Sequence, residues 1–329
     1  MISVTVVVPT YNRAQDLERC LKALQSQSID AGMFEVIVVD DGSGDSTATM
    51  LSRFAAAWPS LRCFRQVNSG PAAARNVGIT HANGSVVAFT DDDCIPPSDW
   101  VQLIHDRFAT GFAGCLHGAV HSSLPASVFV HSVVSDGPVI TSNIAIPQTV
   151  FKRVGTFDTR FRAPWCEDAD LYWRMKKAGV EIVYDADLIM DHPPRYLAFR
   201  SFLRKTRFFQ YAALIARKHP DMEPLSGYRS RMILAAKKLI FIPVTGVLLA
   251  RITPVPLPLA LLIAPLMYCA VDFIRLRKMK VVLAGDGFTV PLEDQVGFVL
   301  LNWTVPIAEM FFLMNGVIRF RSVENCEEP

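Results

Sequence analysis

The chain has 329 residues, enough for one large domain with an accessory region, and a formal net charge of +2. The charges are unevenly distributed along the chain. Residues 1–194 carry 15 Lys/Arg and 21 Asp/Glu, whereas residues 195–238 carry 11 Lys/Arg and 2 Asp/Glu. The pattern excludes a uniformly charged surface. No segment resembles a nucleic-acid-binding module, so we exclude nucleic acid as a partner. We assign the basic band to anionic lipid headgroups, because strongly apolar sequence follows it.

The seven cysteines lie far apart, with neither Cys-x-x-Cys pairs nor zinc-finger spacing. Scattered thiols are typical of a reducing compartment, so we expect a protein that faces the cytoplasm. The first apolar run, residues 2–8, is too short for the apolar core of a signal peptide. We expect it to be the first strand.

Over the first 90 residues, apolar runs without alternation are separated by segments of helical spacing. The runs are typical of strands covered on both faces, as in parallel sheets. We expect strands at 4–8, 35–39, 62–66 and 85–90, and helices at 17–27, 47–58 and 72–81. This succession predicts a doubly wound α/β sheet, in which ligands bind beyond the carboxyl ends of the strands.

After residue 97 the pattern is looser, and the expected elements are shorter or weaker. We expect a helix at 99–110, weak strands at 114–121 and 139–146, a helix at 167–177 and a strand at 181–184. The chain has no internal repeat and no low-complexity tract.

Three consecutive carboxylates, Asp91 to Asp93, follow the last of the four apolar strands. Like charges at the end of a buried strand are costly unless a cation neutralises them. In an extended backbone Asp91 and Asp93 would project to one side and Asp92 to the other, and two carboxylates on one side suit Mg²⁺ or Mn²⁺. A solvated acidic loop is the alternative. Asp40 and Asp41 also lie at the carboxyl end of an expected strand, however, and this coincidence favours a site.

Five motifs occur in order along the first two thirds of the chain. They are Val-Pro-Thr-Tyr-Asn-Arg at 8–13, Val-Val-Asp-Asp-Gly-Ser at 38–43, Gly-Pro-Ala-Ala-Ala-Arg-Asn at 70–76, the acidic run at 91–93 and Glu-Asp at 167–168. Together they resemble family 2 glycosyltransferases over roughly residues 2–195. The resemblance implies the GT-A fold, a mixed α/β sheet that binds nucleotide sugars. It also implies transfer of a sugar, most often from a uridine-linked donor, with inversion at the anomeric carbon.

The resemblance assigns the nucleotide-sugar pocket to the first motifs and to the acidic run. One of Asp40 and Asp41 would accept the imide N–H of uracil, and the sequence leaves open which one. Gly70 lets the chain approach a ligand closely, and Arg75 adds positive charge near the nucleotide. The expected nucleotide-sugar-binding residues are Pro9, Thr10, Tyr11, Asp40, Asp41, Gly70, Arg75 and Asp91.

The resemblance also implies a divalent metal, Mn²⁺ or Mg²⁺, bound by Asp91, Asp93 and His192, with Asp92 incidental. Asp168 would be the general base that takes the proton of the acceptor hydroxyl group. A carboxylate at a helix start should remain ionised, as a base must. Weaker expectations for the acceptor side, or for residues that support the site, are Asn143, Trp165 and Glu167.

The last third of the chain is basic and then strongly apolar. We assign residues 196–238 to basic amphipathic helices at a membrane surface, and residues 239–329 to a membrane-associated region. Residues 239–274 contain only two charged side chains and are long enough for a hairpin of two short spans. The apolar segment 296–318 spans, re-enters or lies on the membrane. A helical core of a soluble protein is the alternative for the whole region.

We therefore expect a catalytic domain at 1–195 that works at the cytoplasmic face of a membrane, the inner membrane if the source is bacterial. It would transfer a sugar to a membrane-presented or lipid-linked acceptor, in the synthesis of cell-surface polysaccharide or glycolipid. The Gln-x-x-Arg-Trp pattern of processive relatives is missing after Tyr196, which favours addition of single sugars. The alternatives are a sugar-phosphate nucleotidyltransferase, whose glycine-rich opening loop is missing here, and a non-catalytic membrane scaffold.

Overall fold

The computed structural model describes residues 2–123, 130–131, 141–196, 204–221, 251, 256–257, 259, 311–312 and 315–320. The chain divides into two compact units. The first unit holds residues 1–127 and 132–195, and the second holds residues 128–131 and 196–329.

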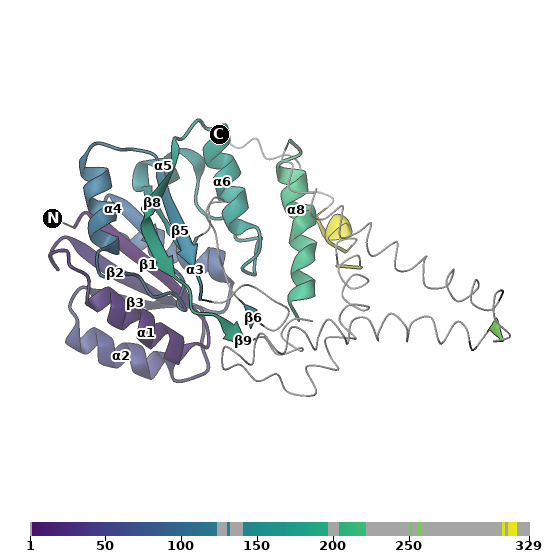
Figure 1. Ribbon diagram of the computed structural model, residues 1–329, viewed down its shortest axis with the longest axis horizontal. Coiled ribbons are helices and arrows are strands. Elements are labelled where there is room, and N and C mark those ends of the chain that lie inside the picture. The colour runs from purple at the N-terminus through teal and green to yellow at the C-terminus, as the bar shows by residue number, and fades with distance from the viewer. Residues whose placement is uncertain are drawn as a thin grey trace. The chain divides into compact units, whose positions relative to one another are not determined.

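The first unit is built on a seven-stranded sheet with the strand order β3-β2-β1-β4-β7-β5-β8 (Figure 1). The strands β1 to β4 are mutually parallel, β7 runs antiparallel to both of its neighbours, and β5 and β8 are again parallel to each other. The strands are β1 (Val4–Thr10), β2 (Phe34–Asp40), β3 (Leu61–Arg65), β4 (Val86–Phe89), β5 (Cys115–His121), β7 (Ile144–Pro147) and β8 (Ile182–Asp191).

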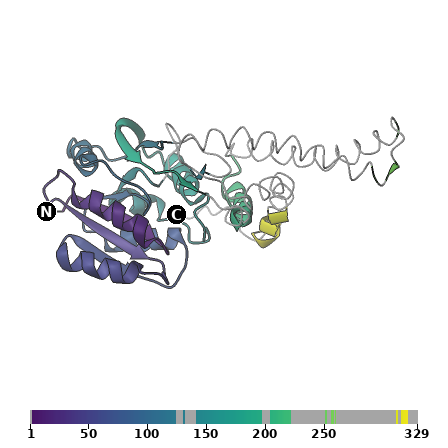
Figure 2. The same cartoon turned by 60° about the horizontal axis from the view of Figure 1, so that its bottom comes forward.

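Helices cover both faces of this sheet, so each central strand is buried on both sides. Along β1, Val4, Val6 and Val8 pack against α1, α2 and α4, while Val7 packs with α3, α5 and α6 on the other face. Figures 1 and 2 both show α1 and α2 side by side on the first face. The helices are α1 (Ala14–Gln25), α2 (Thr47–Ala57), α3 (Pro71–His81), α4 (Trp100–Ala109), α5 (Gln148–Val154) and α6 (Glu167–Lys177).

The elements expected before residue 90 are all present, and α6 begins and ends at the predicted residues. Several elements differ from the expectation. The helix α5 and the short strands β6 and β9 were not predicted, β7 begins at Ile144 and not at residue 139, and β8 continues to Asp191 instead of ending at Tyr184. The polar stretch after Tyr184 is indicative of a loop, but β5 continues to pair with it beyond an irregularity at Gly118/Ala119. The longer strand brings the chain back to the acidic run, where Ile95 pairs with Asp191.

The described part of the second unit is mainly helical. The 3-10 helix η1 (Thr206–Phe209) leads into α8 (Gln210–Lys218), and β9 (Arg195–Tyr196) pairs with β6 (Val130–His131). Residues 315–320 pack on α8, because the Arg319 guanidinium donates to Gln210 Oε1 at 2.8 Å and the rings of Tyr211 and Phe320 lie 6.3 Å apart.

The predicted membrane segments, 239–274 and 296–318, lie almost entirely outside the described residues. Most of the predicted amphipathic region 222–238 lies outside them as well. Among the helices that the structure describes, none combines the length and the apolar character needed to cross a bilayer.

Candidate functional site

The candidate site lies at one edge of the sheet, where three parallel strands end. In the register of the sheet Thr10 of β1 is opposite Asp40 of β2, and β4 ends beside β1 at Phe89, just before the acidic run. Parallel strands present their carboxyl ends to the same edge, so the sequence-distant motifs are brought together there. This placement is the one that the order of the elements predicted.

Asp41 holds the loop that leads into α3. Its carboxylate accepts N–H groups from Ser69 at 2.8 Å and Gly70 at 2.9 Å, and the Gln66 side-chain amide at 2.7 Å. Three hydrogen bonds from neighbouring donors occupy both oxygens, and charge-assisted bonds of this kind are strong. Asp41 is therefore a residue that fixes the shape of the loop before α3.

Asp40 has a different environment, although it is equally buried. One of its oxygens accepts the backbone N–H of Ser43 at 2.8 Å. The other oxygen lies 3.4 Å from Arg65 Nη1 and accepts no hydrogen bond within the described part of the chain. Of the two carboxylates that the sequence left open, Asp40 is the one with an acceptor oxygen to offer to the N–H of a base.

Gly70 is the residue before α3, and its φ of 93° lies in the left-handed region that favours glycine. A Cβ atom built there would lie 2.6 Å from the carbonyl oxygen of Arg162, so a side chain would force the two loops apart. Gly70 was expected to allow a close approach to the backbone. The segment that approaches it in the structure is the 160–164 loop of the same unit.

The motif after β1 contributes one exposed and one buried group. Tyr11 is 47% exposed and its ring is accessible at the edge of the sheet. Thr10 is buried, and its hydroxyl donates to Asp92 Oδ2 at 2.7 Å. Pro9 is a buried residue inside β1, so its side chain supports the strand and is not exposed to a ligand.

The acidic run is a turn and not an extended strand, because the backbone N–H of Cys94 donates to the carbonyl of Asp91 at 3.1 Å. The expectation that Asp92 points away from Asp93 is therefore wrong. Arg13 Nη1 donates to Asp92 at 2.7 Å and to Asp93 at 3.0 Å. Burial raises the pKa of Asp92 to about 6, and repulsion from Asp93 adds to this against the opposing effect of Arg13. Asp92 therefore stabilises the turn through its hydrogen bonds and is not incidental.

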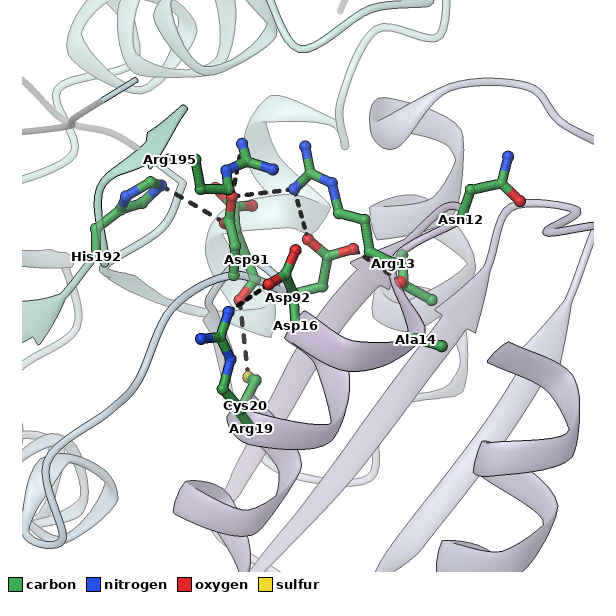
Figure 3. Close-up of polar contacts among 12 residues, drawn as sticks. Asn12, Arg13, Ala14, Asp16, Arg19, Cys20, Asp91, Asp92, His192 and Arg195 are labelled. Atoms are coloured by element: carbon green, nitrogen blue, oxygen red, sulfur yellow. Dashed lines mark hydrogen bonds and ion pairs between the residues drawn. The ribbon is translucent and has the colours of Figure 1, made fainter. Parts of the chain in front are cut away.

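Asp93 is contacted by side chains from two segments, the motif after β1 and the residues after β8; Figure 3 labels the three contacting residues Arg13, His192 and Arg195. Arg13 Nη1 donates to Asp93 Oδ2 at 3.0 Å, and Arg195 Nη2 lies 2.9 Å from the same oxygen. His192 Nε2 lies 3.6 Å from its Oδ1. His192 is buried and directly follows β8, and its backbone N–H donates to His121. The predicted pair Asp93 and His192 is thus brought together by the unexpected length of β8.

Ligand atoms of Asp93, Cys94 and His192 lie within 4.8 Å of one another, and all three residues are buried. A carboxylate, a thiol and an imidazole are all metal-ligating groups, so the donor set fits a divalent ion. Burial is the main cause that raises the pKa of the Cys94 thiol, with Asp91 and Asp93 adding to it, so the metal-free thiol is protonated at neutral pH.

Arg75 joins the acidic run to Glu167, which directly precedes the predicted base Asp168. Arg75 is 2% exposed, and its guanidinium donates to Asp91 at 2.8 Å and to Glu167 at 3.0 Å. The two contacts are therefore buried ion pairs, and the side chain does not extend into the solvent.

The acidic pair at the start of α6 is strongly affected by burial. Burial raises the pKa of Glu167 to about 7, and repulsion from Asp168 adds to the shift, while Arg75 opposes it. Burial also raises the pKa of Asp168, against the N–H of Ala169 and the charge of Arg75. The expectation that the helix start alone keeps Asp168 ionised is therefore incomplete, because Arg75 is needed to offset the burial.

Two of the weaker expectations differ in outcome. Asn143 is completely buried; it accepts the indole N–H of Trp100 at 2.8 Å and donates to the carbonyls of Ala119 and Leu188. It ties α4, β5 and β8 together, and this placement corrects the expectation that it contacts an acceptor. Trp165 is half-buried in the loop before α6, three residues before the predicted base, and its role stays a prediction.

The sequence alone assigned no role to Arg13 or Arg195. Both bind Asp93, from positions 80 and 102 residues away along the chain. A signal was present, because buried carboxylates need counter-charges. Arg13 ends the first motif, and Arg195 lies three residues after the predicted ligand His192. The sequence does not indicate which arginines meet which carboxylates.

Most of the first unit is similar in sequence to known glycosyltransferases. Residues 5–163 match the sequence model described as "Glycosyl transferase family 2". The glycosyltransferase AglE of Haloferax volcanii is 28% identical over 218 residues, which are 61% of this chain and 70% of the relative. The pre-mycofactocin glycosyltransferase of Mycobacterium tuberculosis is 31% identical over 240 residues, which are 66% of this chain but only 48% of that protein.

Two solved structures share the fold. The mannosyltransferase PcManGT of Pyrobaculum calidifontis, solved with GDP-Man and Mn²⁺, has a TM-score of 0.56 and 18% identity, over 94% of this chain and 86% of its own. Residues 1–349 of S. aureus TarS, solved with UDP, give a TM-score of 0.51 and 16% identity, over 95% of this chain and 92% of its own. At these identities the likeness shows an α/β mixed sheet of the GT-A type.

Proposed function

Residues 5–163 of this chain are a glycosyl transferase family 2 domain, and from that premise we propose a metal-dependent, inverting glycosyltransferase. It moves a sugar from a nucleotide-sugar donor to a hydroxyl group of a membrane-presented or lipid-linked acceptor. The product belongs to the synthesis of cell-surface polysaccharide or glycolipid. The match to a glycosyltransferase family favours this activity over a nucleotidyltransferase, and a measured transfer would distinguish it from a non-catalytic scaffold.

The observation that carries the proposal is the bridge formed by Arg75. One buried guanidinium binds Asp91 on the donor side and Glu167 on the acceptor side. The two halves of the site are therefore held at a fixed separation by a single planar side chain. Such pre-organisation is what a transfer between two bound substrates requires.

The donor is a uridine-linked sugar in our proposal, and Asp40 supports it. Its spare carboxylate oxygen accepts an N–H from a base, which uracil and guanine both offer at the edge that faces away from the sugar. Adenine and cytosine lack a ring N–H at the corresponding position. The bound nucleotides of the two similar structures, GDP-Man and UDP, fall within this restriction.

Catalysis in this proposal begins at Asp168, which takes the proton of the acceptor hydroxyl group as that oxygen attacks the anomeric carbon. The bond to the nucleoside diphosphate breaks on the opposite face, so the configuration inverts. Asp91, Asp93 and His192 would hold a divalent ion, which stabilises the charge that develops on the leaving diphosphate. Arg13 and Arg195 orient Asp93, and Arg75 favours the ionised form of Asp168.

The membrane part of the proposal rests on the sequence of the last third. The net charge of +9 between residues 195 and 238 favours anionic lipid, and the apolar segments 239–274 and 296–318 follow it. The catalytic unit then lies at the cytoplasmic face, where nucleotide sugars are supplied. The acceptor is correspondingly lipid-linked or presented by the membrane.

The activity is tested by incubating the full-length protein with UDP-linked and GDP-linked sugars, Mn²⁺ and candidate lipid acceptors, and measuring the release of nucleoside diphosphate. We expect Mn²⁺-dependent release with a uridine-linked sugar, and proton NMR should show inversion at the anomeric carbon. Retention of configuration would contradict the mechanism. If GDP-linked sugars are used and UDP-linked sugars are not, the choice of base is wrong and the mechanism stands.

Membrane attachment is tested by sedimenting the full-length protein with vesicles of phosphatidylcholine, with and without phosphatidylserine. We expect binding that anionic lipid strengthens and salt only partly reverses, since apolar segments add to the electrostatic attraction. Full release by salt would show that the protein contacts the vesicles only through its basic residues between 195 and 238. No binding to either vesicle would contradict the attachment.

A further inference from the structure

A thiol lies among the predicted metal ligands. Cys94 follows the acidic run directly, and its sulfur belongs to the group of ligand atoms from Asp93 and His192 that lie within 4.8 Å of one another. Cys94 is completely buried, and Asp93 and His192 are 6% and 3% exposed. The three groups therefore share one enclosed corner, apart from Asp91, whose side chain is 32% exposed and paired with Arg75.

The two oxygens of Asp93 are divided between different neighbours. Oδ2 faces the guanidinium groups of Arg13 and Arg195, whereas Oδ1 faces His192 Nε2. A cation between Oδ1, the imidazole and the thiol would leave both arginine contacts on Oδ2 in place. The corner is thus able to accept an ion without dismantling the ion pairs that hold the turn.

We infer that Asp93, Cys94 and His192 form an alternative metal site, with Cys94 as a ligand, and that this corner selects borderline or thiophilic divalent ions, Zn²⁺ or Co²⁺, over Mn²⁺ and Mg²⁺. The inference rests on the proposed metal-dependent function. One carboxylate, one imidazole and one thiolate are the ligand set that suits tetrahedral Zn²⁺, and Mg²⁺ prefers oxygen ligands only. On binding, the S–H bond of Cys94 breaks, its proton goes to the buffer and a sulfur–metal bond forms.

The selectivity has a consequence for the reaction. A thiophilic ion held by Asp93, Cys94 and His192 lies in the enclosed corner, whereas the donor site pairs Asp93 with the more exposed Asp91. Both modes use Asp93, so they exclude each other. Zn²⁺ should therefore compete with Mn²⁺ and inhibit the transfer that Mn²⁺ supports.

The test is a titration of the full-length protein with Co²⁺, without nucleotide, followed by absorption spectroscopy. A thiolate ligand gives a charge-transfer band in the near ultraviolet, together with the intense visible bands of tetrahedral Co²⁺. We expect both in the wild-type protein. We expect Cys94→Ser to lose the charge-transfer band, and its Zn²⁺ affinity to fall at least tenfold, because loss of even an outer partner of a metal ligand costs about 10- to 100-fold.

Two matched variants control for other thiols. Cys20 is also buried, and its sulfur lies 3.7 Å from the carbonyl oxygen of Asp91, but it does not belong to the cluster of Asp93, Cys94 and His192. Cys63 is exposed on β3. Cys20→Ser and Cys63→Ser should both retain the band. Loss of the band in Cys20→Ser but not in Cys94→Ser would overturn the assignment.

The wild-type spectrum alone can also overturn the inference, so the test does not depend on the folding of a core variant. Weak octahedral bands without charge transfer would show that Co²⁺ has oxygen and nitrogen ligands only. The result is separable from the proposed function. A thiolate band in a protein that never releases nucleoside diphosphate would keep this metal site and reject the enzyme, and Mn²⁺-dependent turnover without the band would do the reverse.

Discussion

Two groups of carboxylates follow the parallel strands β2 and β4, on either side of β1, and they are neutralised in different ways. Asp41 after β2 is held by backbone N–H groups and one amide of its own loop. The carboxylates after β4 are held by the guanidinium groups of Arg13, Arg75 and Arg195. The backbone donors to Asp41 are fixed by the fold. The side chains of Arg13 and Arg195 are 36% and 28% exposed, so another cation can displace them, whereas that of Arg75 is buried. The first group therefore has fixed partners, and part of the second group has partners that can be exchanged.

The second group also has more carboxyl groups than guanidinium groups, which favours binding of a further cation. Five carboxyl groups, Asp91, Asp92, Asp93, Glu167 and Asp168, interact with three guanidinium groups. When all of them are ionised, the difference between three positive and five negative charges is −2. A divalent cation would complete the balance, and nothing comparable is needed around Asp41.

The largest effect is expected at the acceptor side of the guanidinium-held group. Asp168→Asn removes the proposed base while keeping the size of the side chain, so turnover should fall by about 100- to 10,000-fold. Binding of the donor nucleotide should be unchanged, as measured by calorimetry with UDP. Unchanged turnover would show that Asp168 is not the base.

Arg75→Gln should destabilise the fold as well as the site. It leaves Glu167 buried without its cation, and removal of one partner of a buried pair costs about 3–5 kcal/mol in the free energy of unfolding. Arg65→Gln is the matched control, because Arg65 is 54% exposed beside Asp40 and its loss should cost less than about 1 kcal/mol. Equal costs in urea unfolding would remove the distinction between the two groups.

Asp40 and Asp41 should separate binding from stability. Asp41→Asn loses charge-assisted bonds from the loop, so the free energy of unfolding should fall by about 1–3 kcal/mol. Asp40→Asn should instead weaken UDP binding by roughly tenfold to a hundredfold, with the fold largely unaffected. The opposite pattern in calorimetry and urea unfolding would exchange the two roles.

The smallest effect is a dependence of stability on pH at Glu167. Its pKa is about 7 in the folded chain against 4.5 without the fold, so the folded state binds the proton more tightly. Stability from this group is full below pH 4.5 and is lost as the pH rises to about 7. Glu167→Gln should therefore lose less stability than wild type across that window in urea unfolding. Parallel curves would contradict the raised pKa.

Much of the fold could be predicted from local signals. The apolar runs of β1 and β2 and the helical spacing between them sufficed, because strands buried on both faces leave a clear trace in composition. The prediction ended this strand at Tyr184 because the polar residues that follow in β8 resemble a loop. Its extension depends on pairing with β5, which lies 67 residues earlier at the pair Cys115 and Ile182.

The site was predictable as a set of carboxylates but not as a network. Motifs placed Asp40, Asp91, Asp93 and Asp168 at strand and helix ends, and the structure brings them to one edge of the sheet. Which cation meets which carboxylate depends on tertiary approach over many residues, as for Arg195 and Asp93. Asn143 is the opposite case, because a residue expected on the acceptor side forms its hydrogen bonds with Trp100, Ala119 and Leu188 in the core.

The central claim is that the guanidinium-held carboxylates form a metal-dependent transfer site, and Asp93 tests it most directly. We predict that Mn²⁺-dependent release of nucleoside diphosphate from a uridine-linked sugar is lost in Asp93→Asn, which keeps the shape of the side chain but not its charge. Asp92→Asn, in the same turn but bound to Thr10 and Arg13, should keep measurable Mn²⁺-dependent turnover. Full turnover of Asp93→Asn, or of wild type in the presence of a metal chelator, would contradict the claim.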